Sequence, residues 1–294
     1  MRKTVLVTGA NGQLGKSLQQ IAPDFSEQYR FLFTDVDTLD ITDLAAIRRM
    51  VQEENVDFLI NAAAYTAVDK AESDIELAYL LNEKAVANLA AAAKEHGTFL
   101  VHISTDYVFD GKSTRPYRTT DTPNPTSVYG KSKLAGETAI VESRCRGAIV
   151  RTAWLYSPYG NNFVKTMLRL ADTKEFINVV CDQTGCPTLA LDLARFILTV
   201  IEHDGNSDHL NCYHFTNRGE ITWYDFACEI IRQYGKSCSV HPIPSSSYPT
   251  PVTRPAYSVL DLTESASLFD IPDWKESLTR VLPEITYNYK NNIL

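Results

Sequence analysis

Short apolar runs, each ended by a turn or polar residue, recur through the first half of the chain. They lie at 4–8, 30–34, 57–60, 98–103 and 148–151. Continuous runs of this length are typical of parallel strands that helices cover on both faces. Stretches with a helical pattern separate them, at 12–21, 43–54, 75–96 and 126–143. The alternation predicts an α/β fold built on a Rossmann-type, doubly wound parallel sheet.

The second half is less regular. Helices are predicted at 161–171 and 189–202 and a strand at 212–216, and a capping box at 222–225 opens a helix to about residue 233. Five prolines and three consecutive serines at 242–255 predict extended loop. We expect a dinucleotide-binding domain at 1–152, to which the chain returns near 189–216. The remainder, 153–188 and 217–294, is expected to form a smaller, mixed α/β substrate-binding lobe at the C-terminal side.

Composition narrows the class of protein. The 294 residues carry a net charge of −8 and no Lys/Arg cluster, which argues against a nucleic-acid surface. No apolar stretch is long enough for a signal peptide or a membrane span. The six cysteines show neither a Cys-x-x-Cys pair nor a nearby histidine at metal spacing. These features predict a cytoplasmic protein with reduced thiols, no metal site and no membrane partner.

A glycine pattern, Gly9-x-x-Gly12-x-x-Gly15, follows the first predicted strand and opens a helix. In that context glycines let the backbone approach a pyrophosphate, whose charge the helix N-terminus stabilises. Asp35 ends the second strand, twenty residues after Gly15, where a carboxylate can bond a ribose hydroxyl. It favours NAD(H), while Lys16 and Arg2 keep NADP(H) open. The alternative for the glycine pattern is an ordinary strand–helix turn, and the alternative for Asp35 is a solvent-exposed acid in a turn.

A second pattern supplies proton chemistry. Tyr129 and Lys133 are four residues apart and therefore project from one face of a helix. An ammonium close to a phenol lowers the pKa of the phenol, typically by roughly 1–3 units. Thr105 follows the fourth strand, where its hydroxyl can bond a carbonyl oxygen. The Thr105–Tyr129–Lys133 set beside a bound dinucleotide predicts a reductase.

Longer motifs carry a family resemblance. The chain resembles the extended short-chain dehydrogenase/reductases and, within them, the dTDP-4-dehydrorhamnose reductase family. The matching segments span most of the chain and lie at 61–72, 104–111, 128–137, 151–156, 160–163, 182–188 and 254–255.

The resemblance implies the residues of the site. Together with the glycine pattern, it assigns cofactor contacts to Gly9, Gly12, Gln13, Leu14, Gly15, Asp35, Asp40, Ile41, Ala64, Tyr65, Thr66, Tyr129 and Lys133. It assigns substrate contacts to Thr105, Asp106, Trp154 and Arg254. Trp154 alternatively packs the two lobes together, and Arg254, a plausible diphosphate clamp, alternatively anchors a surface loop.

The same resemblance implies a reaction. NADH or NADPH would reduce the 4-keto group of dTDP-4-dehydro-6-deoxy-L-mannose to dTDP-L-rhamnose, with Tyr129 as general acid and Thr105 and Lys133 in support. The alternatives are a reductase or epimerase of another nucleotide sugar and a non-catalytic dinucleotide-binding regulatory subunit.

Three positions depart from the family pattern. Tyr257 stands where an asparagine is usual. Ser17 and Leu191 replace carboxylates that hold a bridging Mg²⁺ in some members. We therefore expect a monomer or a homodimer without a metal bridge.

Overall fold

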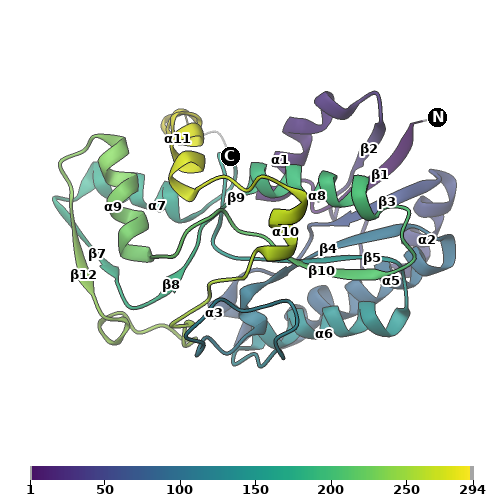
Figure 1. Cartoon of the computed structure of the whole chain (residues 1–294), viewed down its shortest axis with the longest axis horizontal. Helices are drawn as coiled ribbons and strands as arrows, with labels where there is room; N and C mark the ends of the chain where they lie inside the picture. The colour runs from purple at the N-terminus through teal and green to yellow at the C-terminus, as the bar shows by residue number, and fades with distance from the viewer. Residues whose placement is uncertain (1, 292–294) are drawn as a thin grey trace.

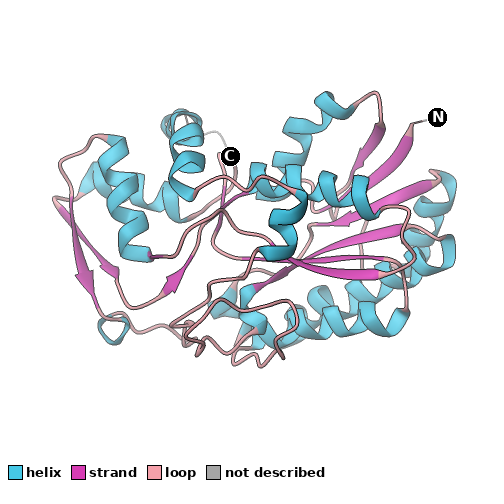
Figure 2. Ribbon diagram, viewed as in Figure 1, coloured by secondary structure: helices cyan, strands magenta, loops and turns pink. Residues whose placement is uncertain are grey.

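A six-stranded parallel sheet forms the larger part of the molecule. The computed structural model describes residues 2–291, and the strands lie in the order β2-β1-β3-β4-β5-β10 (Figures 1 and 2). Their bounds are β1 Lys3–Thr8, β2 Tyr29–Phe33, β3 Val56–Asn61, β4 Phe99–Thr105, β5 Gly147–Thr152 and β10 Leu210–His214. Every neighbouring pair is parallel, so the predicted fold class is confirmed.

Helices cover both faces of this sheet. α1 (Gln13–Ile21) and α8 (Ala190–Asp204) pack on the face to which Val5, Val7 and Val101 project. α2 (Leu44–Glu53), α5 (Ala85–His96) and α6 (Val128–Ser143) lie on the other face. Since successive strand residues point to opposite faces, the fully apolar runs in the sequence reflect burial on both sides.

The chain leaves the sheet after β5 and returns to it. β10 pairs with β5 from Leu210 opposite Gly147 to His214 opposite Arg151, and α8 packs beside α1. The helix and strand predicted at 189–202 and 212–216 are therefore present, each shifted by one or two residues.

A second core lies in the smaller lobe, at the left of Figure 1. It is built from α7 (Phe163–Thr173), α9 (Trp223–Tyr234), α11 (Trp274–Lys290) and the parallel pair β7 (Phe176–Val180) and β12 (Ser239–Ile243). The predicted capping box is confirmed, because Thr222 and Asp225 bond each other's backbone at the start of α9. The predicted loop at 242–255 is wrong at its start, where β12 extends to Ile243.

Shorter elements connect these parts. They are α3 Val68–Ala71, α4 Ile75–Tyr79, β6 Leu155–Tyr156, β8 Thr184–Gly185, β9 Thr188–Leu189, β11 Ile221–Thr222 and α10 Thr263–Leu268. Within residues 2–291, none of the helices combines the length and the apolar character that crossing a bilayer requires.

A π-helical turn, Leu80–Lys84, joins α4 to α5 inside the helix predicted at 75–96. Its Asn82 is buried: the amide oxygen accepts the Tyr65 N–H (2.9 Å), and Nδ2 donates to the Tyr65 carbonyl (3.0 Å) and to Ser132 Oγ (3.0 Å). A π turn inserts one residue into a helix and re-aims its side chains. Here it brings Asn82 between the 62–66 loop and α6, two segments that line the site.

Candidate functional site

A cavity of about 880 Å³ opens at the carboxyl ends of β1, β3, β4 and β5. This position lies where the strand order reverses between β1 and β3, as expected for a ligand site in an open parallel sheet. The predicted residues that line it are Gly9, Gly12, Gln13, Leu14, Asp35, Asp40, Ile41, Ala64, Thr66, Thr105, Asp106, Tyr129, Lys133 and Trp154. Gly15 and Tyr65 do not line it: the first packs under the turn, and the Tyr65 hydroxyl donates to Asp74 (3.0 Å).

The glycine turn forms one end of this cavity. Gly9 has φ +68°, and a Cβ there would lie 2.6 Å from the Ala63 nitrogen. A Cβ on Gly15 would lie 2.3 Å from the Gly9 carbonyl oxygen, so only glycine lets α1 start this close to β1. The N-cap of α1 is Gly12, which has no side chain to occupy the first helical amides. These amides suit a pyrophosphate, and the cradle fits a dinucleotide.

Asp35 ties this turn to the end of β2. Its Oδ2 accepts the Asn11 N–H (2.8 Å), and its Oδ1 accepts the Val36 N–H (2.9 Å). The carboxylate thus fixes the loop and also faces the cavity. Asp40 lies nearby, and the backbone and hydroxyl bonds from Thr42 lower the pKa of its carboxyl.

The predicted proton-transfer residues gather at the other end. Ser127 caps α6 by accepting the Gly130 N–H (3.1 Å), which starts the helix one residue before Tyr129. Thr105 ends β4, and its hydroxyl donates to Asp106 Oδ1 (2.9 Å). Tyr129, Lys133 and Thr105 are all buried and all line the cavity, so the structure brings the three together.

The electrostatics of the phenol differ from the prediction. Burial raises the pKa of Tyr129 well above its usual value, a shift that a hydrogen bond with Thr105 opposes only in part. The prediction that Lys133 lowers the phenol's pKa is wrong in the ligand-free protein, because the Lys133 amino group contacts other partners. Lys133 Nζ donates to the Ile103 carbonyl (2.7 Å) and lies 3.3 Å from His102 Nε2. Burial lowers the pKa of Lys133 to about 8.

Asp106 is a buried carboxyl in the same cavity. Its Oδ1 is bonded to Thr105, whereas Oδ2 has no hydrogen-bond partner among residues 2–291. Burial raises the pKa of Asp106 to about 6. A buried carboxyl with a free oxygen is suited to bind a hydroxyl group of a ligand.

Trp154 lies where it can serve both alternatives that the sequence leaves open, contact with a ligand and packing between the two lobes. Its ring lines the cavity and also stacks on Trp223 of the lobe, with ring centroids 3.6 Å apart. A Cβ on Gly185 would lie 2.7 Å from the indole, so this glycine makes room for it. Sequence reasoning missed Trp223, because only the tertiary fold brings it beside Trp154.

Arg254 lines a second cavity, of about 1090 Å³, in the lobe between α7 and β7. It forms an ion pair with Asp69, and its Nη1 donates to the Tyr107 hydroxyl (3.1 Å). Tyr107 lines both cavities and therefore lies at their junction. Asp69 and Tyr107 therefore join the candidate site. Sequence reasoning missed both residues, although they fall inside the matching segments 61–72 and 104–111.

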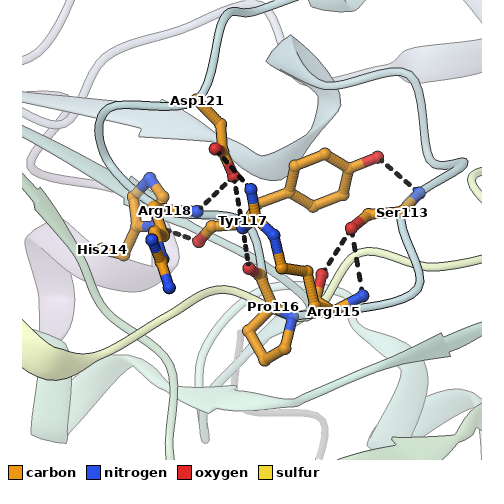
Figure 3. Close-up of polar contacts among 7 residues, drawn as sticks. All are labelled: Ser113, Arg115, Pro116, Tyr117, Arg118, Asp121 and His214. Atoms are coloured by element: carbon orange, nitrogen blue, oxygen red, sulfur yellow. Dashed lines mark hydrogen bonds and ion pairs between the residues drawn. The ribbon is translucent and has the colours of Figure 1, made fainter.

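The loop between Thr105 and Tyr129 is held by its own polar contacts (Figure 3). Arg115 forms a two-pronged ion pair with Asp121 (2.8 and 2.9 Å), and Tyr117 Oη accepts the Ser113 N–H (3.1 Å). The Tyr117 carbonyl lies 3.1 Å from His214 Nδ1, which ties the loop to β10. These contacts fix the connection between the two catalytic candidates.

Comparison with known proteins identifies the family. Residues 2–287 match the family described as RmlD substrate binding domain. The dTDP-4-dehydrorhamnose reductase of Aggregatibacter actinomycetemcomitans is 40% identical over 94% of this chain and 97% of its own.

Two solved structures share the fold. The dTDP-4-dehydrorhamnose reductase of Clostridium acetobutylicum aligns with a TM-score of 0.90 and 43% identity, covering 96% of this chain and 99% of that one. That of Bacillus anthracis, in complex with NADP, aligns with a TM-score of 0.90 and 39% identity over 97% of this chain and 100% of that one. The chain therefore belongs to the dTDP-4-dehydrorhamnose reductase family of oxidoreductases.

Proposed function

We propose that this protein reduces the 4-keto group of dTDP-4-dehydro-6-deoxy-L-mannose to dTDP-L-rhamnose, using NADH or NADPH. The observation that carries the proposal is one cavity with a dinucleotide cradle at one end and Thr105, Tyr129 and Lys133 at the other. The names of the similar enzymes supply the sugar and the base. A bound nicotinamide supplies the hydride to C4.

Tyr129 provides the proton for the same carbonyl. Because burial raises the pKa of its phenol, Tyr129 enters the reaction protonated at physiological pH. Negative charge that grows on O4 attracts this proton. The Thr105 hydroxyl can turn its proton from Asp106 to Tyr129 and so stabilises the phenolate that remains. General acid catalysis of this kind contributes roughly 10²–10⁴-fold to the rate.

The two cavities divide the substrate between them. The sugar would lie against Asp106 and Trp154 in the first cavity, with the free Oδ2 of Asp106 accepting a sugar hydroxyl. The nucleotide would occupy the second cavity, beyond Tyr107. Arg254, at the junction, would bind the diphosphate with its forked donors, and its pairing with Asp69 keeps the guanidinium in place beforehand.

A coupled assay tests the proposed reaction. The purified protein is mixed with dTDP-4-dehydro-6-deoxy-L-mannose and with NADH or NADPH in turn, and nicotinamide absorbance is followed. Steady oxidation with at least one nicotinamide, and formation of dTDP-L-rhamnose, are expected. An epimerase returns the hydride to its substrate, so isomerisation without net oxidation would contradict the proposal. Tight cofactor binding without any turnover would instead indicate a regulatory subunit.

A further inference from the structure

A row of buried polar side chains crosses the carboxyl ends of three neighbouring strands, beneath α6. Thr8 of β1 lies opposite Asn61 of β3, and Asn61 lies opposite His102 of β4. Their exposed fractions are 1%, 1% and 0%. Polar groups buried this deeply must be hydrogen-bonded, so the position of each proton in the row follows from its partners.

The hydrogen-bond partners of the Asn61 side chain allow only one placement of its Oδ1 and Nδ2 atoms. Its Oδ1 accepts the Ala63 backbone N–H (3.2 Å) and the Thr8 hydroxyl (2.7 Å). Since a backbone N–H can only donate, the amide oxygen must face it. The NH₂ group of Asn61 therefore faces His102 Nδ1, at 3.0 Å. An NH₂ group also can only donate, so His102 Nδ1 accepts and the neutral ring carries its proton on Nε2.

This tautomer aims a donor at Lys133. His102 Nε2 lies 3.3 Å from Lys133 Nζ, which also donates to the Ile103 carbonyl (2.7 Å). An ammonium has no lone pair for a second donor, whereas a neutral amine has one. We propose that His102 is a positioning residue that holds its Nε2–H against Lys133 and stabilises the neutral amine form of Lys133 over the ammonium form in the ligand-free protein.

The charged and titratable groups around this pair are few. Glu137, one turn further along α6, favours the ammonium form of Lys133, but its carboxylate is already bound by Arg151 and Ser104. Tyr129, on the preceding turn, is kept uncharged by burial, and the charge of Asp106 raises the pKa of that phenol further. α5 contributes the apolar side chains Val86 and Leu89 to the core on this face of the sheet. Burial lowers the pKa of both Lys133 and His102, which favours the neutral form of each.

A catalytic role for the proton exchange of Lys133 rests on the proposed function. A lysine whose neutral form is stabilised, beside the proposed proton donor Tyr129, is able to release and take up a proton during turnover, whereas a permanent ammonium acts only as a fixed charge. Both tests below use the ligand-free full-length protein, so their failure is distinguishable from a failure of the proposed reaction.

The first test reads the tautomer directly. In protein labelled with ¹⁵N-histidine, NMR distinguishes the protonated from the accepting ring nitrogen, and the His102 signals are assigned by their loss in His102→Gln. We expect a neutral ring with the proton on Nε2. A proton on Nδ1, or an imidazolium at neutral pH, would overturn the inference.

The second test measures Lys133 itself. The pH dependence of its acetylation by acetic anhydride is followed by mass spectrometry, with exposed Lys131 of the same helix as an internal reference. In the parent protein the reactivity of Lys133 should rise with a midpoint near pH 8. In His102→Leu the lost hydrogen bond should move this midpoint upward by about one pH unit, which corresponds to roughly fivefold lower reactivity at pH 8.

A matched variant separates this effect from general damage. Thr8→Val removes one bond to Asn61 but keeps the Ala63 N–H that fixes the amide, so the Lys133 midpoint should not move. An unchanged midpoint in His102→Leu, or a parent midpoint at the ordinary lysine value near 10.5, would contradict the inference. If His102→Leu does not fold, the tautomer measured in the parent protein decides.

Discussion

The buried ion pair between Arg151 and Glu137 should be the most costly single contact to break in the sheet domain. Arg151 extends from β5 and Glu137 from α6, and their side chains are 6% and 5% exposed. The guanidinium donates from Nε (2.9 Å) and from Nη2 (2.6 Å) to the two carboxylate oxygens. Ser104 of β4 donates to the same carboxylate. The pair thus binds α6 to the two strands whose ends carry the site.

Arg151→Met removes the cation and leaves the carboxylate buried with Ser104 as its remaining partner. Breaking a buried pair on one side costs roughly 3–5 kcal/mol, because the unpaired charge keeps its desolvation penalty. The contact of the guanidinium with the Phe109 ring, at 5.2 Å, is lost as well. We therefore expect the free energy of unfolding to fall by roughly 3–5 kcal/mol.

Urea unfolding followed by circular dichroism measures this loss. The double variant Glu137→Leu/Arg151→Met is the control, because an apolar pair of similar volume carries no buried charge and should regain most of the stability. A loss below about 1 kcal/mol in Arg151→Met would place the pair with weak surface ion pairs and refute the reasoning. A double variant no more stable than the single one would do the same.

Two further changes test how the site is built. Asp106 has a folded-state pKa of about 6 against 3.8 in the unfolded chain, so the folded protein binds the proton more tightly. The contribution of Asp106 to the free energy of unfolding is therefore fully present below pH 3.8 and is lost as the pH rises through 6. Unfolding of the ligand-free protein should show a loss of roughly 3 kcal/mol across that window, absent in Asp106→Asn; a parallel pH profile in both proteins would contradict this. Gly136→Ala places a Cβ 2.1 Å from the Asn82 carbonyl oxygen, which should separate α6 from the π turn and cost roughly 1–3 kcal/mol in urea unfolding. Thr138→Ala, exposed on the same helix, should stay within about 0.5 kcal/mol of the parent, and an equally stable Gly136→Ala would show that the two segments are not packed as described.

Local patterns were sufficient to predict the sheet and its helices. The apolar runs, the glycine turn and the Thr222 capping box each depend on residues close together in sequence. α11 was not predicted, and Pro283 inside it disrupts the usual helical signal. β7 and β12 were missed because their pairing joins segments more than sixty residues apart, and β12 contains Pro242.

Sequence reasoning predicted which residues line the cavity better than it predicted their pKa values and hydrogen-bond partners. The spacing of Tyr129 and Lys133 placed both side chains in the cavity, as the structure has them. Spacing does not report burial, which raises the pKa of Tyr129, nor the Ile103 carbonyl and His102 ring that engage Lys133. Likewise, the partnership of Arg254 with Asp69 and Tyr107 appears only when lobe and sheet meet.

Replacement of Tyr129 by phenylalanine tests the central claim most directly. The variant keeps the ring that packs edge-on against Tyr107, at 5.5 Å between centroids, but lacks the proton. We predict that turnover of the 4-keto nucleotide sugar falls by about 10²–10⁴-fold, while the dissociation constant of the nicotinamide cofactor changes little. Turnover close to that of the parent protein would show that Tyr129 is not the general acid.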